Sequence, residues 1–156
     1  MQFILENPEE TAAIGAALWQ VMPEKCWIYL SGELGAGKTT LIRGLLRAAG
    51  YTQAVKSPTY SLVEEYEING RRIYHFDLYR LKAPEELQWL GIDDYLQQAA
   101  LCFIEWPQMG AGYLPNPDLV INLQHQANMR LIEIKALQLN ENKAYKLIWK
   151  NKEILL

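Results

Sequence analysis

The stretch Gly32-Glu33-Leu34-Gly35-Ala36-Gly37-Lys38-Thr39 decides the fold of this chain. It fits the pattern G-x-x-x-x-G-K-[ST] and is called the P-loop below. An apolar run at residues 26–30 predicts a buried strand before it, and residues 40–47 after it have the apolar spacing of a helix. The pattern requires this order of strand, loop and helix. The sequence therefore predicts a site for a nucleoside triphosphate.

The residue types of the P-loop explain how phosphate would be held. Glycines at 32, 35 and 37 let the backbone turn, so that its N–H groups and the positive end of the next helix face phosphate oxygens. We expect Lys38 to lie along the β- and γ-phosphates as a point charge, and the Thr39 hydroxyl to coordinate Mg²⁺. The rival dinucleotide fingerprint G-x-G-x-x-G is not matched.

Length and composition indicate one domain, residues 1–156, because half of the 156 residues are apolar. A net charge of -3 and a pI near 5.4 provide no large basic field, so we expect no strong direct binding to nucleic acid. No secretory signal and no run of 18 apolar residues is found, which predicts a cytoplasmic protein without a membrane span. Cys26 and Cys102 lie in apolar runs and are expected to be buried, reduced thiols.

The chain as a whole predicts an α/β fold, a P-loop nucleotide-binding fold with a mixed central sheet flanked by helices. Asn7 and Pro8 predict the start of a helix that Pro23 ends, and Gly50 predicts the end of the helix after the P-loop. Short helices are expected at residues 84–91 and 93–100. Strands are expected at residues 1–5, 26–30 and 100–105 and, after a loop at 108–118, as an antiparallel group at 119–123, 130–139 and 144–149.

Asn69-Gly70 predicts an antiparallel hairpin with a two-residue turn. This turn fixes the register of the two strands. The expected cross-strand pairs are Glu67 with Arg72, Tyr66 with Ile73, and Glu64 with His75. We therefore interpret His75 as a surface residue of the hairpin with a charged partner, and not as a catalytic residue.

Hydrolysis of a bound triphosphate requires neutralised charge and an oriented water, so acids near the P-loop are the next candidates. Glu105 ends an apolar strand and is our candidate acid on the magnesium side, opposite Thr39. Asp77 ends the second hairpin strand and is our candidate for orienting water or for an indirect magnesium contact. Thr59, in a proline-fixed segment, is a candidate sensor of the γ-phosphate. Either acid can instead be an exposed polar end of its strand.

Other residues near these motifs receive structural interpretations. Trp106 is interpreted as a core or loop aromatic. Arg43 and Arg80 are interpreted as solvated side chains; either could approach phosphate, but neither has an obvious route to the γ-phosphate. A hydrolase without an arginine of this kind is expected to be slow on its own. The guanine-specific pattern N-K-x-D and the switch pattern D-x-x-G are both missing, which favours adenine over guanine.

Four motifs together closely resemble those of the bacterial TsaE (YjeE) family, in order and spacing, from near Thr11 to Pro107. They are residues 32–40, Ser57-Pro58-Thr59-Tyr60, His75-Phe76-Asp77-Leu78-Tyr79-Arg80 and Ile104-Glu105-Trp106-Pro107. That family consists of small ATPases that are needed, with partner proteins, for the threonylcarbamoyl modification of adenosine 37 in tRNA. The departure is Tyr60, where phenylalanine is common, and the last fifty residues carry no matching motif.

The resemblance implies ATP and Mg²⁺ as cofactors, with ADP as product. By position it implies catalytic roles for Lys38, Asp77 and Thr59 and metal contacts for Thr39 and Glu105. The nucleotide contacts implied are Thr11, Glu33, Gly35, Ala36, Gly37, Lys38, Thr39 and Thr40, with Thr11 near the adenine.

The implied partners are the tRNA-modification proteins of the threonylcarbamoyl-transfer complex, through which tRNA would be reached only indirectly. The acidic pI agrees with this, because the chain lacks a basic surface of its own. Two alternatives stay open. One is a nucleotide-dependent binding module with little turnover. The other is a small-molecule kinase, although residues 81–98 offer only Lys82 as a basic side chain for a lid.

Overall fold

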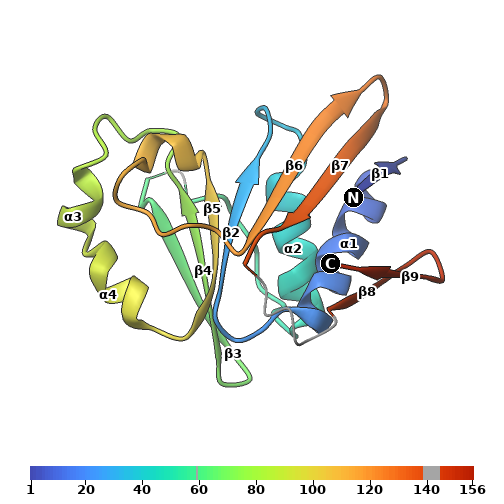
Figure 1. Cartoon of the computed structure of the whole chain (residues 1–156), viewed down its shortest axis with the longest axis horizontal. Coiled ribbons are helices and arrows are strands. Elements are labelled where there is room, and N and C mark those ends of the chain that lie inside the picture. The colour runs from blue at the N-terminus through green and yellow to red at the C-terminus, as the bar shows by residue number, and fades with distance from the viewer. Residues whose placement is uncertain (59, 139–144) are drawn as a thin grey trace.

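The computed structural model of the chain describes residues 1–58, 60–138 and 145–156 and is built on one seven-stranded sheet with helices on both faces (Figure 1). The strand order is β1-β7-β6-β2-β5-β4-β3. The strands are β1 (Gln2–Leu5), β2 (Cys26–Ser31), β3 (Val63–Ile68), β4 (Arg71–Asp77), β5 (Ala100–Glu105), β6 (Leu119–Gln126) and β7 (Met129–Ala136).

The sheet is mixed, as predicted. Its centre is parallel, because β2 pairs in parallel with both β5 and β6, and β5 pairs in parallel with β4. Its two sides are antiparallel, through the pairs β3–β4, β6–β7 and β1–β7. The P-loop follows β2, so it leaves the sheet from a central parallel strand, which is where α/β folds bind ligands.

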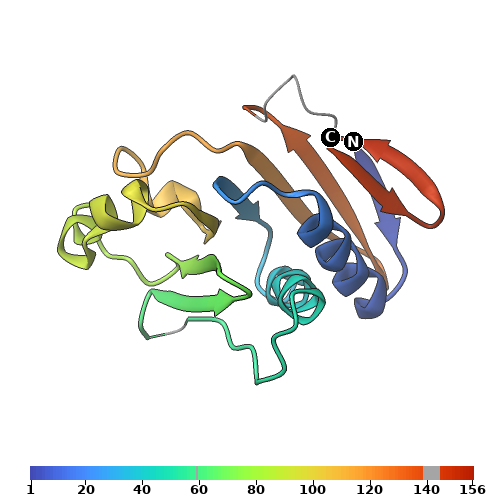
Figure 2. The ribbon, with the colours of Figure 1, turned by 90° about the horizontal axis from the view of Figure 1, so that it is seen from below.

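Two helices pack side by side on one face of the sheet, as Figure 2 shows. They are α1 (Pro8–Val21) and α2 (Lys38–Ala48). The predicted N-cap of α1 is confirmed, since the Asn7 side chain accepts a hydrogen bond from the Glu10 backbone N–H at 2.8 Å. The two helices approach closely at Gly15 and Gly44. A Cβ on Gly15 would lie 2.0 Å from the Leu41 carbonyl oxygen, so only glycine fits there.

The opposite face is covered by shorter elements: α3 (Glu86–Leu90), α4 (Ile92–Gln97) and the 3₁₀ helix η1 (Pro107–Gly110). Strand alternation divides the core between the two faces. In β4, Ile73 packs toward α1 and α2, whereas Tyr74 and Phe76 pack toward α3 and α4. His75 and Asp77 therefore share the face of Ile73, which is the face of the P-loop helix.

The C-terminal part of the chain differs from the prediction in one respect. The expected strand at residues 144–149 is present in its described part as β8 (Lys146–Trp149), but it pairs with β9 (Lys152–Leu155), which was not predicted. These two strands form a separate two-stranded sheet. Their turn residues, Lys150 and Asn151, both have positive φ. This turn geometry favours glycine, so the sequence gives no recognisable turn signal at these positions.

Two further predictions were tested by the fold. The hairpin register is confirmed at all three predicted pairs. Cys26 and Cys102 are free and buried, and burial raises the pKa of the Cys102 thiol to about 12 and also raises that of Cys26. Within the described residues, no helix is both long and apolar enough to cross a membrane.

Candidate functional site

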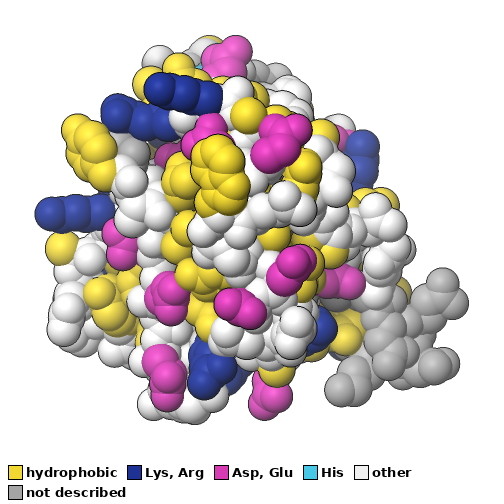
Figure 3. All heavy atoms as spheres, turned by 90° about the vertical axis from the view of Figure 1, so that its left-hand side faces the viewer, with side chains coloured by type: hydrophobic (Ala, Val, Ile, Leu, Met, Phe, Trp, Pro, Cys, Tyr) yellow, Lys and Arg dark blue, Asp and Glu magenta, His cyan; other side chains and the backbone are white. Residues whose placement is uncertain are grey.

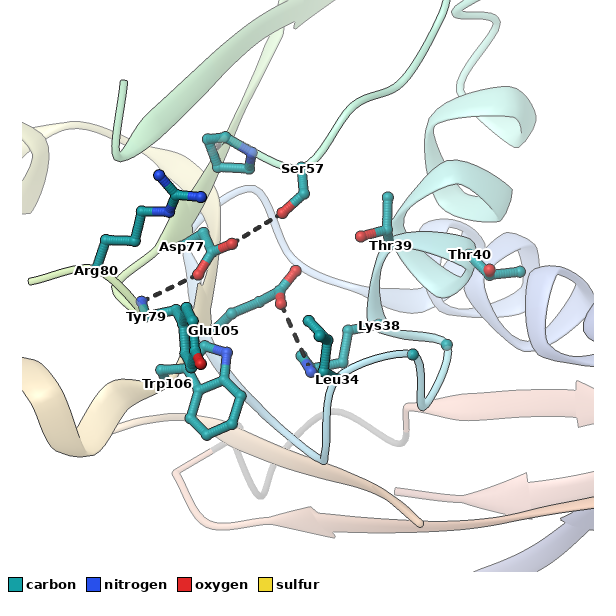
Figure 4. A pocket seen from close by; sticks show the side chains of 13 residues that line it. Leu34, Lys38, Thr39, Thr40, Ser57, Asp77, Tyr79, Arg80, Glu105 and Trp106 are labelled. Atoms are coloured by element: carbon teal, nitrogen blue, oxygen red, sulfur yellow. Dashed lines mark hydrogen bonds and ion pairs between the residues drawn. The ribbon is translucent and has the colours of Figure 1, made fainter. Parts of the chain in front are cut away.

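A cavity of about 370 Å³ opens where β2, β4 and β5 end and α2 begins (Figure 4). The side chains and backbone that line it come from four separate stretches. They are Leu34, Gly35, Gly37, Lys38, Thr39 and Thr40; Ser57 and Pro58; Asp77, Tyr79 and Arg80; and Glu105 and Trp106. The cavity therefore has two walls, the P-loop with the start of α2 on one side and the ends of β4 and β5 on the other.

The P-loop wall is shaped by its backbone. Gly32, Gly35 and Gly37 have φ values of 143°, 78° and 111°, a region that side chains other than glycine rarely adopt. Gly32 is also blocked by its surroundings, since a Cβ there would lie 2.4 Å from the Leu123 carbonyl oxygen. These conformations explain why the pattern needs glycine at these positions.

Lys38 is buried within the P-loop wall, with 5% of its side chain exposed. Its Nζ donates hydrogen bonds to the carbonyl oxygens of Gly32 at 2.7 Å and Glu33 at 2.9 Å. The same Nζ lies 3.8 Å from Oε2 of Glu105 across the cavity. The ammonium group is thus held at the centre of the site with its charge directed toward the opposite wall.

Glu105 is the acid that faces Lys38, and it is almost fully buried. Its Oε1 lies 2.8 Å from Nε2 of His75, and its Oε2 is the oxygen near Lys38. The parallel pairing of β4 with β5 sets Glu105 directly opposite Asp77. The two acids are therefore neighbours at one end of the sheet, although 27 residues lie between them in the sequence.

Asp77 is held by two hydrogen bonds. Ser57 Oγ donates to its Oδ2 at 2.9 Å, and the Tyr79 backbone N–H donates to its Oδ1 at 3.1 Å. The first bond links the 57–58 segment to the end of β4 (Figure 4). A carboxylate can accept about four hydrogen bonds, so Asp77 retains capacity for a further donor, such as a water molecule.

The interpretation of His75 as a surface residue is wrong. Its side chain is fully buried and bonded to Glu105. The reason is that β4 is an interior strand, paired with β3 on one edge and with β5 on the other. The hairpin signal predicted the first partner only. The alternation His75, Asp77 against Phe76, Leu78 is the sequence signal that places His75 on the P-loop face.

Trp106 differs from its interpretation because it lines the cavity. Arg80 is exposed, as interpreted, and it lines the cavity as well. Trp106 has a φ of 57°, and its ring lies 5.2 Å from Lys38 Nζ and 5.0 Å from the Tyr79 ring. A tight turn after β4, in which the Leu81 N–H donates to the Leu78 carbonyl, returns Arg80 to the cavity. An arginine therefore lines the cavity, with its guanidinium carbon 5.1 Å from the centre of the Tyr60 ring.

Three of the predicted nucleotide contacts are not among the described residues that line the cavity. Thr11 is buried behind the P-loop, where its methyl group would lie 3.4 Å from a Cβ on Gly37. Ala36 is buried, and its carbonyl accepts a hydrogen bond at 3.0 Å from Nε of Arg130. Glu33 lines an adjoining cavity of about 210 Å³ that it shares with Trp106. Thr59 lies outside the described residues.

Arg130, at the start of β7, is a contact that sequence reasoning missed. It reaches the P-loop from a strand that lies two places from β2 in the sheet. No local sequence pattern around residue 130 predicts this contact, because the contact depends on the order of strands in the sheet. Arg43 lines a second cavity, which meets the main one at Thr39 and Ser57.

The donors at the site fit a magnesium–nucleotide complex. Mg²⁺ in such sites takes one or two protein oxygens together with phosphate oxygens and water. Thr39 and Glu105 offer a hydroxyl and a carboxylate on opposite sides of one cavity, and the positive-φ glycines leave the loop free of side chains that would obstruct phosphate. The residues present are therefore suited to both groups.

Comparisons with known proteins agree on one family. The model of the family described as "Threonylcarbamoyl adenosine biosynthesis protein TsaE" matches residues 5–132. A Haemophilus influenzae protein named tRNA threonylcarbamoyladenosine biosynthesis protein TsaE is 54% identical over 109 residues, 70% of this chain and 69% of that protein. A Bacillus subtilis protein of the same name is 36% identical over 115 residues, 74% of this chain and 72% of its own. The crystal structure of Bacillus subtilis YdiB superposes with a TM-score of 0.74 at 30% identity, covering 87% of this chain and 84% of that one.

Proposed function

The chain belongs to the TsaE family, and we propose that it binds and hydrolyses ATP with Mg²⁺ in support of the threonylcarbamoyl modification of tRNA. The observation that carries this proposal is the meeting of Lys38, Glu105 and Asp77 around one cavity beside the P-loop. The pathway in this proposal comes from the relatives, whose names refer to tRNA threonylcarbamoyladenosine biosynthesis. The geometry of the cavity supports the proposed reaction class, phosphoryl transfer to water.

The P-loop side of the cavity would bind the triphosphate. Its backbone and the N-terminus of α2 provide an environment for phosphate oxygens. Lys38 would exchange its hydrogen bonds with the Gly32 and Glu33 carbonyls for contacts with the β- and γ-phosphates. Thr39 and Glu105 would hold Mg²⁺, which when bound neutralises charge on the β- and γ-phosphates.

The opposite wall would act on the attacking water. Asp77, held in place by Ser57 and the Tyr79 N–H, would accept a hydrogen bond from the water and orient it toward the γ-phosphorus. Attack of the water oxygen breaks the bond to the β–γ bridging oxygen, so the products are ADP and inorganic phosphate. Thr59 would sense the γ-phosphate, a role supported by Ser57 and Pro58, which precede it and line the cavity.

The pathway role would be exercised through proteins that handle the tRNA. The chain carries a net charge of -3. On the face that bears α3 and α4, Asp and Glu side chains are scattered among apolar ones, and Lys and Arg side chains lie mainly toward its edges (Figure 3). Such a face is poorly suited to the phosphate backbone of tRNA. We therefore infer that the partners are the threonylcarbamoyl-transfer proteins, and that ATP hydrolysis drives repeated rounds of their activity.

The decisive experiment is multiple-turnover tRNA modification with purified transfer proteins, tRNA and ATP. Modification should continue over many rounds with this chain present and stop early without it or with its Lys38→Ala variant. In parallel, phosphate release by the isolated protein should be slow and should rise severalfold when the transfer proteins are added. Equal modification without this chain would refute the partner role.

The same assay separates the alternatives. A nucleotide-dependent binding module predicts that a non-hydrolysable ATP analogue supports modification as well as ATP does. A small-molecule kinase predicts phosphate appearing on an acceptor in place of free phosphate. Free phosphate whose release depends on the transfer proteins is expected only for the proposed function.

A further inference from the structure

His75 is a buried histidine behind the wall of the cavity. Its side chain has no exposed surface and does not line the cavity. Ile73 precedes it on the same face of β4 as an ordinary core residue. A polar ring at such a position costs free energy unless it forms a hydrogen bond, and an aliphatic side chain would fill the space without that cost. The imidazole therefore needs a reason beyond packing.

The hydrogen bond that His75 does make is directed at Glu105. Nε2 lies 2.8 Å from Oε1 of the carboxylate, and both side chains are buried. Nδ1, on the other side of the ring, has no partner among the described residues. A proton on Nδ1 would be a buried donor without an acceptor, whereas a proton on Nε2 has a carboxylate oxygen in reach. The Nε2–H tautomer donating to Glu105 is therefore the favoured state.

The two oxygens of Glu105 have different surroundings. Oε1 faces His75, away from the cavity, and Oε2 faces Lys38 and the cavity at 3.8 Å. Lys38 is a partner that the ATP site would draw away, because its ammonium group is needed by the phosphates. The terminal torsion of a glutamate is soft, so a carboxylate without a fixed partner can rotate. The bond to His75 does not involve Lys38, so it would remain when Lys38 turned to phosphate.

We propose that His75 is a positioning residue, which fixes the plane of the Glu105 carboxylate so that Oε2 is presented to the magnesium side of the cavity. This inference rests on the proposed ATP site. It adds to that site a residue that touches neither nucleotide nor metal and acts through Glu105. Hydrogen-bond partners of metal-binding carboxylates typically change metal affinity about 10- to 100-fold when removed.

The first experiment measures equilibrium binding of ATP with and without Mg²⁺, for example with a fluorescent ATP analogue. The quantity of interest is the gain in affinity that Mg²⁺ produces. His75→Leu fills the space with an apolar side chain and removes the donor, so the gain should fall about tenfold while metal-free binding changes less than about twofold. His75→Gln places an amide N–H near the position of Nε2 and should restore most of the gain.

The matched control is His125→Leu, which removes the other histidine of the chain from an exposed position on β6. Its magnesium gain should equal that of the unchanged protein. Full magnesium gain in His75→Leu would overturn the positioning role alone. An equal loss in His75→Gln would also overturn it, because shape and not the hydrogen bond would then be responsible. Unchanged protein that binds no ATP would overturn the proposed function together with this role.

A second measurement needs no change at His75 and decides the case if His75→Leu fails to fold. In ¹⁵N-labelled protein carrying His125→Leu, the remaining histidine signals belong to His75. The two-bond nitrogen–proton spectrum should show a proton on Nε2 and a hydrogen bond that persists when ATP and Mg²⁺ are added. A proton on Nδ1 alone would contradict the proposal.

Discussion

The two walls of the cavity are made in different ways. The P-loop wall comes from one continuous stretch, and its shape follows from glycine backbone angles at positions 32, 35 and 37. The opposite wall joins the ends of β4 and β5, and its side chains meet only because Asp77 pairs with Glu105 in the sheet. The first wall is therefore local in sequence, whereas the second depends on strand order and register.

From this difference we expect the two walls to have different roles, nucleotide binding for the P-loop wall and catalysis for the opposite wall. A wall built from backbone and one lysine is suited to holding a charged ligand that many proteins share. A wall built from side chains in register, with His75 behind Glu105 and Ser57 bonded to Asp77, is suited to orienting a metal ion and a water. Changes in the first wall should abolish binding, and changes in the second should alter catalysis with the nucleotide still bound.

The largest effect is expected for Lys38→Ala. This change deletes the charge that would contact two phosphates, and charge-assisted hydrogen bonds contribute about 1.5 to 3 kcal/mol each. The kcat/KM for ATP should fall about 1,000-fold, with most of the loss in binding measured by titration. Lys82→Ala, at an exposed lysine on the α3 side, is the matched control and should leave both unchanged. Unchanged turnover in Lys38→Ala would refute the site.

Substitutions of the two acids should have kinetic effects that differ from that of Lys38→Ala and from each other. Asp77→Asn should lower kcat about a hundredfold while ATP binding changes little, because the water loses its oriented acceptor. Glu105→Gln should instead raise the magnesium concentration needed for half-maximal activity about tenfold. Measuring kcat across a magnesium series for both variants tests the assignment. A magnesium dependence that follows Asp77 would reverse the two roles.

The sequence predicted the local wall well and the other wall in part. The P-loop pattern, the α1 cap at Asn7 and the Asn69-Gly70 register all depend on neighbours within a few residues, and their structures agree. Glu105 and Asp77 became candidates because an acid that ends an apolar strand is a recognisable signal, and both line the cavity. Their pairing with each other was not predicted, since nothing in a single sequence states that β4 lies beside β5.

Two of the residues that were missed share this cause. His75 becomes an interior residue only when β5 joins β4, and Arg130 reaches Ala36 only because β7 lies two places from β2. Trp106 and Arg80 line the cavity because the chain turns just after each acid, at Trp106 with a φ of 57° that its residue type does not favour. Contacts set by topology were missed, and so were these two residues, whose place depends on the turns.

The glycines of the P-loop provide a sharper test of the local wall. Gly32→Ala and Gly35→Ala introduce the same methyl group in the same loop, both at positive φ. At Gly32 the methyl meets the Leu123 carbonyl at 2.4 Å, whereas at Gly35 nothing lies within 4 Å. Gly32→Ala should therefore lower the free energy of unfolding by about 1 to 3 kcal/mol more than Gly35→Ala. Thermal and denaturant unfolding measure the difference, and equal losses would mean that the contact with Leu123 adds no cost.

The smallest effect is expected for Arg130→Ala, and it tests whether the P-loop wall is as local as its sequence suggests. Arg130 Nε donates to the Ala36 carbonyl at 3.0 Å, and its side chain packs against Gly37. A single hydrogen bond contributes about 0.5 to 1.5 kcal/mol net, so ATP binding should weaken only about threefold if the loop holds its own shape.

Two further variants identify what that effect means. Lys135→Ala removes a positive charge from the same strand at an exposed site and should change nothing, which excludes a general electrostatic cause. Arg130→Lys keeps the charge but not the Nε geometry and should resemble Arg130→Ala. If Arg130→Ala instead weakened binding as strongly as Lys38→Ala, the P-loop would depend on support from β7. The contrast between the two walls would then fail, because the conformation of the P-loop would also depend on the order of strands in the sheet.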